Sequence, residues 1–399
     1  MKWTSALSHN ANLHAAIDEI TAQTLAALGA PPDLAFLFAT DHYRAGFDRL
    51  PATVHARLGG GQLLGCSASG VIGSGEEIEQ RAALSLVAAQ LSDVDADSWA
   101  LEATDLAPGT LHSQRCAALA HKIAPKPVAF VLLADPFTFQ PERLIRSLES
   151  AFPSRAIVGG LASGGQAPGE IALFLNDTTR NSGALILALS GDIEMQTAVA
   201  QGCRPIGDPL FVSSCQGNRI TGLDGQSPID VLSTLFERAG KQDQMLMQHS
   251  LFVGIAMRAG ESQYDQGDYL IRNITGIDQS RGAIAVGVEL HENQVVQFHL
   301  RDARTAAEDL DRVLSRLHDQ YLDTQPAGAL LFSCTGRGQG LYGEAGHDSG
   351  VFHRRFGAIP LGGFFCNGEI GPVGGTTFLH GYTSAFAVFN PLESHPNSR

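Results

Sequence analysis

The sequence is poor in positive charge and in long apolar runs. Lysine and arginine together number 27 of 399 residues against 41 aspartates and glutamates, which gives a formal net charge of −14. Nucleic-acid binding requires a basic face that neutralises phosphates, so we expect no nucleic-acid partner. The apolar stretches at 128–133 and 184–189 are far shorter than the roughly 20 residues that a membrane-spanning helix needs. We therefore expect no membrane partner either.

Secretion and metal-binding motifs are also missing. Polar residues at Ser8, His9 and Asn10 interrupt the apolar core that a signal peptide would need, so we expect a cytoplasmic protein. The six cysteines include no C-x-x-C pair, which favours reduced thiols. No H-E-x-x-H motif occurs, because His291-Glu292 is not followed by a second histidine at helical spacing. The sequence thus predicts no metal and no other cofactor.

Glycine, by contrast, is concentrated near the C-terminus. It supplies fifteen of the 54 residues from 328 to 381. Two short apolar strands in this stretch each run directly into a glycine-rich segment with polar side chains, at 333–338 and at 366–371. Because glycine allows sharp turns and close approach of the backbone to a ligand, this is where we expect the functional site.

A strand, a connection and a second strand recur three times along the chain. The separation between the strands is 28, 28 and 30 residues, which leaves room for a helix and favours neighbouring parallel strands. The similarity reflects either an internal duplication or the chance likeness of glycine-rich segments. The strand pairs are 35–39 with 63–70, 129–133 with 157–164, and 329–333 with 359–365.

Apolar periodicity and turn residues predict the remaining elements and the domains. We expect an α/β fold of two related domains with mixed, partly parallel sheets flanked by helices. The domains are an N-terminal helix in 1–32, a first domain at 33–227, a second at 228–389 and a disordered tail at 390–399. Further helices are expected at 228–238 and 302–321, a meander at 184–189, 196–200, 210–213 and 217–220, and strands at 251–257, 269–272, 283–288 and 295–300.

Six motifs in a fixed order resemble the FIST family, the F-box and intracellular signal transduction proteins. They are VGGLASGG at 158–165, AVAQGCRPIGDPLFV at 198–212, YLIRNITGID at 269–278, QFHLRDA at 297–303, LFSCTGRG at 331–338 and GGFFCNGEIGPVGG at 362–375. The resemblance covers about 33–385, as an N-terminal FIST region and a FIST C region. It implies a sensory module for a small ligand, such as an amino acid or a related metabolite, and it supplies no catalytic residue. No fused output region is recognised, so we expect action in trans on a signalling protein partner.

The predicted ligand site lies at the ends of strands, where loops converge at the edge of a parallel sheet. The guanidinium groups of Arg272 and Arg301 suit a carboxylate or phosphate, and Glu369 suits an ammonium group. We expect these side chains to meet around one hollow. The candidate ligand-binding residues are Arg272, Asn273, Arg301, Ser333, Cys334, Thr335, Gly336, Arg337, Asn367, Gly368, Glu369, His380, Cys66 and Ser67.

Other interpretations of the same residues stay open. Residues 338–343 match G-x-G-x-x-G, but 344–350 is too rich in glycine for the helix that a dinucleotide site needs. A cysteine- or serine-dependent hydrolase or transferase would use Cys66, Cys334 or Cys366 at the strand ends, and a protein–protein adaptor would need no pocket. Arg301 with Asp302, and Arg337 with Glu369, would alternatively form internal ion pairs. Ligand binding without turnover is the interpretation we prefer.

Overall fold

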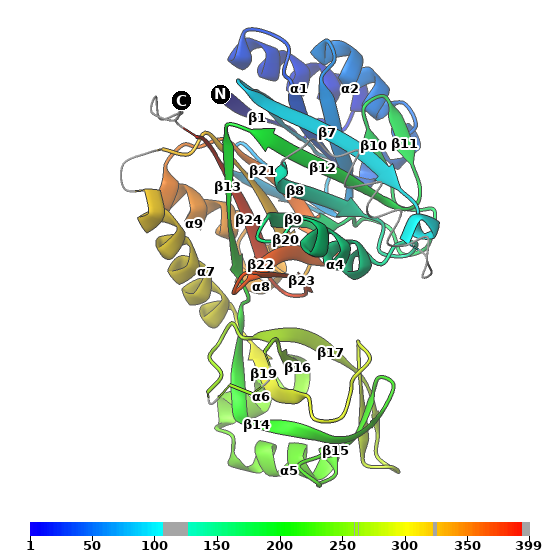
Figure 1. The fold of residues 1–399 in the computed structure, drawn as a ribbon, viewed down its shortest axis with the longest axis vertical. Coiled ribbons are helices and arrows are strands. Elements are labelled where there is room, and N and C mark those ends of the chain that lie inside the picture. Colours follow the sequence, from blue (N-terminus) through cyan, green and yellow to red (C-terminus); the bar gives the residue numbers. More distant parts are fainter. Residues whose placement is uncertain (107–126, 259, 262, 322–324, 393–399) are drawn as a thin grey trace. The chain divides into compact units, whose positions relative to one another are not determined.

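The chain folds into two compact units, each built from sheets and helices (Figure 1). The computed structural model describes residues 1–106, 127–258, 260–261, 263–321 and 325–392. The first unit comprises Met1–Val199, Asp311–Leu379 and Thr383–Arg399, and the second Ala200–Leu310 and His380–Tyr382. The predicted class, an α/β fold of two parts with mixed sheets, is confirmed. Each unit draws on segments from both sides of residue 227.

Three six-stranded sheets form the first unit. The first sheet has the order β1 (Lys2–Ser8), β6 (Leu84–Gln90), β2 (Leu34–Thr40), β3 (Gln62–Ala68), β10 (Leu173–Leu175) and β11 (Thr178–Arg180). The second has β7 (Val94–Leu101), β12 (Ala184–Gly191), β8 (Pro127–Ala134), β9 (Ala156–Leu161), β22 (Glu369–Val373) and β23 (Thr376–His380). The third has β13 (Ile193–Ala200), β24 (Ser384–Pro391), β20 (Gly328–Cys334), β21 (Leu361–Cys366), β4 (Gly70–Gly73) and β5 (Glu76–Glu79).

The three sheets share one plan, with a parallel pair at the centre. The pairs β2/β3, β8/β9 and β20/β21 are parallel, as the repeated spacing predicted. Each pair is followed along the chain by a two-stranded hairpin that joins a different sheet. The hairpin after β3 joins the third sheet, the one after β9 joins the first, and the one after β21 joins the second. This cyclic exchange interlocks the three repeats into one body.

Outer strands are exchanged in the opposite direction. β7 and β13 leave their own repeats to pair beside β12 and β24, and β1 takes the equivalent place beside β6. The expected meander through β12 and β13 is therefore wrong, because these strands belong to different sheets. The N-terminal segment also holds more than the predicted helix, since β1 precedes it.

A glycine at the same place in each parallel pair explains the recurring sequence. Gly65, Gly159 and Gly363 are paired with leucines on the neighbouring strand. A Cβ atom on these glycines would lie 1.8, 1.9 and 1.8 Å from the carbonyl oxygen of that leucine. The two backbones approach so closely that only glycine fits. The similarity of the three segments thus follows from one steric requirement.

Helices cover the connections between the paired strands. The predicted first helix is confirmed as α1 (Leu13–Leu28), which begins where the Asn12 side chain accepts bonds from two backbone amides and ends at Gly29. The crossovers carry α2 (Leu50–Leu58), α4 (Pro141–Ala151), and α8 (Gln339–Tyr342) with α9 (His347–Phe356). The prediction that 344–350 is not helical is wrong in part, because α9 begins at His347.

In the second unit, six strands form a sheet that closes on itself through antiparallel pairs. The order is β14 (Cys203–Gln216), β15 (Arg219–Leu223), β18 (Ala283–Val286), β17 (Tyr269–Asp278), β16 (Leu251–Ala256) and β19 (Val295–Arg301). The predicted strands and the helix α5 (Pro228–Arg238) are present, whereas α6 (Lys241–His249) was not predicted. The helix predicted at 302–321 is α7 (Ala303–His318), capped by Asp302, followed by a short turn of 3-10 helix at Asp319–Tyr321.

Two expectations concern the ends and the surface of the molecule. Asn390 and Pro391 belong to β24 and are not part of a disordered tail, and residues 393–399 lie outside the described residues. Within the described part of the chain, the helices are too short or too polar to cross a membrane.

The close approach within the parallel pairs gives a direct test. Gly363→Ala places a methyl group where the carbonyl of Leu331 lies, so we expect a loss of roughly 3 kcal/mol or more in the free energy of unfolding, measured by urea denaturation. Gly340→Ala is the matched control, because a Cβ there would meet no atom within 4 Å. Equal stability of the two variants would contradict the proposed steric origin of the repeats.

Candidate functional site

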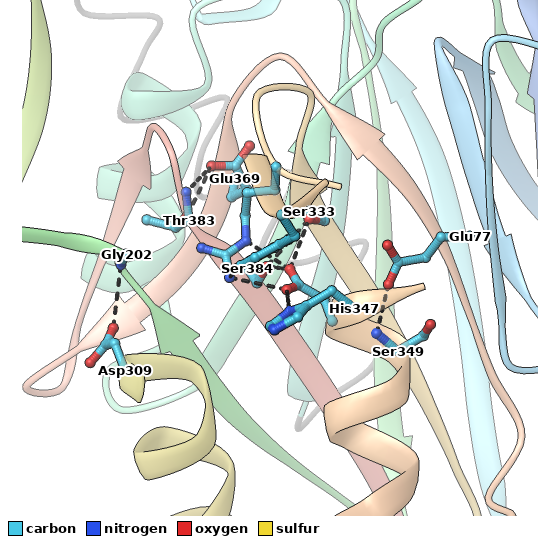
Figure 2. Close-up of polar contacts among 12 residues, drawn as sticks. Glu77, Gly202, Asp309, Ser333, His347, Ser349, Glu369, Thr383 and Ser384 are labelled. Carbon is cyan, nitrogen blue, oxygen red and sulfur yellow. Dashed lines mark hydrogen bonds and ion pairs between the residues drawn. The ribbon is translucent and has the colours of Figure 1, made fainter. Parts of the chain in front are cut away.

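Buried charges of the first unit gather around the parallel pair β20/β21 (Figure 2). Arg337 and Glu369 are fully buried, and Asp348 and Glu77 are 1% and 4% exposed. Asp135, at the end of β8, is the other fully buried acid among the described residues of this unit, and it binds its own turn at Phe137 and Thr138. The hydroxyl groups around the charged group belong to Ser333, Ser349, Thr383 and Ser384.

The other two repeats fill the equivalent positions with apolar side chains. The three glycines described above, Gly65, Gly159 and Gly363, mark equivalent points of the parallel pairs. The residue that is paired two positions after this glycine is Ser333 in the third repeat, but Ala39 and Ala134 in the first and second. The residue directly after the same glycine pairs with a strand of the exchanged hairpin. Its partner on the hairpin is Glu369 in the second sheet, but Leu173 in the first sheet and Val71 in the third. Ser333 and Glu369 thus have apolar counterparts at both equivalent positions.

An ion pair between Arg337 and Asp348 is the centre of this group. The Arg337 Nε donates to Asp348 Oδ2 at 2.7 Å, and Nη2 donates to Oδ1 at 3.1 Å. Arg337 follows β20 in a tight turn, in which its amide donates to the carbonyl of Cys334, and Asp348 lies in the first turn of α9. The alternative of an internal ion pair for Arg337 is therefore correct in kind, but the partner is Asp348 and not Glu369.

Several neutral groups also bind the Asp348 carboxylate. Ser333 and Ser384 donate to Oδ2, and the His347 ring contacts Oδ1 at 3.1 Å (Figure 2). Burial alone would raise the pKa of Asp348, but the Arg337 guanidinium and these hydrogen bonds hold that pKa well below its usual range. Asp348 is therefore ionised, and the hydroxyls of Ser333 and Ser384 are engaged by it.

Two carboxylates from β5 hold the segment after β20 and the start of α9. Glu79 accepts the amide of Gln339 at 2.8 Å. Glu77 accepts the amide of Ser349, in the first turn of α9, at 2.7 Å (Figure 2). Glu77 and Glu79 are two residues apart on one strand, so their side chains share a face. Burial, together with the charge of Asp348, raises the pKa of Glu77 to about 7.

Glu369 is a further buried acid of the first unit. Its Oε2 accepts hydrogen bonds from the Thr383 amide at 3.1 Å and from the Thr383 hydroxyl at 2.8 Å. The carbonyl of Thr383 in turn accepts from the amide of Cys334 at the end of β20. The carboxylate is thereby fixed beside the carboxyl end of the parallel pair.

The remaining first-unit candidates mostly hold strands together. Asn367 donates to the carbonyls of Leu161 and Ala162, and the Gly368 carbonyl accepts from Leu161. The Ser67 hydroxyl donates to the carbonyl of Ser163. Cys66 lies in the apolar core, while Thr335 and Gly336 are exposed on the turn after β20. Their part in ligand binding stays a prediction.

Four candidates belong to the second unit. The Arg301 guanidinium lies 4.9 Å from the centre of the Tyr382 ring, and the Tyr382 hydroxyl donates to Asn273. Arg272 donates to the carbonyl of Ile271, and His380 is buried. In the alternative interpretation Asp302 would pair with Arg301, but the Asp302 carboxylate binds Arg204 at 3.3 Å.

Sequence reasoning missed several members of the polar group. Asp348 lies in a segment that was predicted to be irregular, and Glu77 lies 272 residues from Ser349, whose amide it binds. The one local signal for Glu77 is its spacing from Glu79 on a short strand. No local sequence pattern indicates that the hairpin β4/β5, which carries Glu77 and Glu79, joins the third sheet.

Burial and hydrogen bonding argue against two other interpretations, catalysis by Cys66 or Cys366 and dinucleotide binding. Burial raises the pKa of the Cys66 and Cys366 thiols well above the ordinary value, which makes both poor nucleophiles. The amide of Ser349 in the first turn of α9 already donates to Glu77, where a dinucleotide would place its phosphates. Among the described residues, no three His, Cys, Asp or Glu side chains are arranged to hold a metal ion.

Comparison with known proteins gives consistent matches along the chain. A model of the FIST N domain matches residues 33–226, and a model of the FIST C domain matches residues 228–372. The protein named Uncharacterized protein Rv0628c of Mycobacterium tuberculosis is 34% identical over 362 residues, 90% of this chain and 92% of that protein. Uncharacterized protein Mb0898c of Mycobacterium bovis is 34% identical over 368 residues, 90% and 91% of the two chains. F-box/LRR-repeat protein At5g63520 of Arabidopsis thaliana is 22% identical over 314 residues, 66% of this chain and 58% of its own length.

The raised pKa of Glu77 predicts a pH dependence of stability. A carboxyl group whose pKa is about 7 in the folded chain and 4.5 ordinarily binds its proton more tightly when folded. Its contribution to stability is therefore complete below about pH 4.5 and is lost as the pH rises through 7. Glu77→Gln should remove this decline, a difference of the order of 2 kcal/mol between pH 5 and pH 8 in urea unfolding. The exposed Glu76→Gln is the control, and a Glu77→Gln slope equal to that of the control would disprove the assignment.

Proposed function

The chain belongs to the FIST family, and from this premise we propose that it is a sensory protein that binds a small ligand beside the third parallel pair. The family supports a sensory role in signal transduction. We further propose that the ligand is an amino acid or a related carboxylate metabolite. In this proposal the protein works in the cytoplasm, without turnover, on a signalling partner.

The observation that carries the proposal is the broken symmetry of the first unit. Apolar side chains fill the positions of Ser333 and Glu369 in the other repeats, so the fold itself does not require polar groups there. Burying charged groups is costly, and replacing a buried ion pair by apolar residues is often neutral or stabilising. Buried charges that the architecture does not need are typical of functional sites.

The place of these groups in the sheet supports a ligand site. Arg337 and Glu369 lie just beyond the carboxyl ends of β20 and β21, and parallel sheets collect their ligands at that edge. Glu369 offers a buried carboxylate to an ammonium group. In the second unit, Arg272 and Arg301 stay candidates for anionic groups, because a guanidinium binds a carboxylate through two parallel bonds.

A ligand screen tests the proposal. We expect some amino acid or carboxylate metabolite to raise the melting temperature by a few degrees, because a ligand that binds only the folded state stabilises it. Glu369→Gln keeps the shape of the side chain and removes its charge, so it should abolish most of that shift.

Glu308→Gln, which removes an exposed carboxylate that pairs with Arg304, is the control and should retain the full shift. The proposal fails if no metabolite stabilises the wild-type protein. It also fails if Glu369→Gln responds to the ligand as Glu308→Gln does.

A further inference from the structure

The second unit has a small pocket where β15, β18 and β17 lie side by side. Its volume is about 140 Å³. A cavity of about 150 Å³ with apolar walls accommodates a benzene ring, so this pocket has room for one branched apolar side chain. The residues that line it are Arg219, Gly276, Ile277, Asp278, Ala283, Ile284 and Ala285.

Small residues on two neighbouring strands explain the pocket. Gly276 of β17 pairs with Ala285 of β18, and Ala283 lies two residues further along β18. A Cβ atom at Gly276 would lie 3.8 Å from the Cβ of Ala285, which is an ordinary contact distance. The pocket is thus a consequence of residue choice, because the backbone permits a larger side chain at Gly276.

An exposed isoleucine also lines the pocket. Ile277 pairs with Ile284 of β18, and Ile284 pairs with Ile220 of β15. Ile284 and Ile220 are 1% and 0% exposed, whereas Ile277 is 60% exposed. Single exposed apolar side chains are common, but this one lies beside a pocket that fits a side chain of its own size. A projecting apolar group and a place to bury it are therefore adjacent on one surface.

Charges of opposite sign flank the pocket. The exposed Arg219 pairs with Ala285, and Asp278 pairs with Ala283. Arg219 and Asp278 therefore lie on opposite sides of β18, displaced by two residues along it. Asp278 forms an ion pair with the exposed Arg281 at 4.0 Å. Exposed pairs contribute little to stability, and a carboxylate has acceptor sites for a second cation.

Two copies of this surface complement each other. A two-fold axis that lies in the plane of contact and passes between Arg219 and Asp278 exchanges their positions, so each arginine faces the other copy's aspartate. In such a contact one patch serves both copies. The chain carries a net charge of −14, which makes copies repel. The charged residues here are two arginines, Arg219 and Arg281, and one aspartate, so that repulsion is reduced at this surface.

We propose that the protein forms a two-fold symmetric dimer through this surface. Ile277 of each copy fills the pocket of the other, and Arg219 pairs with Asp278 of the partner subunit. All residues of the contact belong to the second unit. The inference goes beyond the proposed function and does not depend on the ligand.

Sedimentation equilibrium of the intact protein tests the dimer. Over protein concentrations from about 1 µM to about 1 mM, we expect the average mass to rise from that of one chain towards that of two. A protein that remains a single chain at the highest concentration would overturn the proposal. The pocket would then belong to a partner of another kind.

Two variants change the projecting group and the pocket separately. Ile277→Ser removes the apolar side chain, and Gly276→Val fills the pocket at a position where a Cβ causes no clash. Each should weaken dimerisation at least tenfold. Phe211→Ser is the matched control, because Phe211 is 57% exposed in the same unit and does not line the pocket. The proposal fails if either variant, verified as folded by circular dichroism, dimerises as strongly as this control.

Charge reversal tests the symmetric pairing. Arg219→Asp and Asp278→Arg should each weaken dimerisation at least threefold, since each places like charges opposite one another. The double variant restores opposite charges at both symmetric contacts, so its dimerisation should return close to that of the wild type. A double variant that dimerises no better than the weaker single variant would show that the two residues do not face each other.

Discussion

The buried ion pair between Arg337 and Asp348 organises the polar part of the first unit. Arg337 uses three of its donors on Asp348 and Tyr342, and Asp348 also collects Ser333, Ser384 and the His347 ring. Removing one partner of such a pair leaves an uncompensated buried charge, which costs ~3–5 kcal/mol. The turn after β20, the start of α9 and the beginning of β24 are therefore held together by one carboxylate.

Exchange of hairpins explains how this group is assembled from distant parts of the chain. The first repeat supplies Glu77 and Glu79 on β5 to the third sheet, and the third repeat supplies Glu369 on β22 to the second sheet. Each of these acids therefore lies in a sheet whose parallel pair belongs to another repeat. Each position is filled independently, so Ser333 and Glu369 are polar where the equivalent residues of the other repeats are apolar.

The sequence was sufficient to predict the regular elements and the parallel pairs, because these depend on local patterns. Strand spacing and glycine placement predicted β2/β3, β8/β9 and β20/β21, and apolar periodicity predicted α1 and α7. The exchange of hairpins leaves no local trace, so β13 was assigned to the wrong partner and Glu77 was overlooked. Of the site residues, Ser333, Arg337 and Glu369 were predicted because they lie at or after the ends of predicted strands. Asp348 was not predicted, because the flanking glycines suggested that its segment is not helical.

The central claim is that the third repeat is polar for the sake of a ligand and not for the sake of the fold. The double variant Arg337→Leu, Asp348→Leu tests it most directly, since it replaces the buried ion pair by apolar side chains. We predict that the variant folds, since apolar side chains can replace a buried ion pair, and that titration calorimetry shows no binding of the ligand that stabilises the wild-type protein. A folded double variant that binds this ligand as tightly as the wild type would contradict the account.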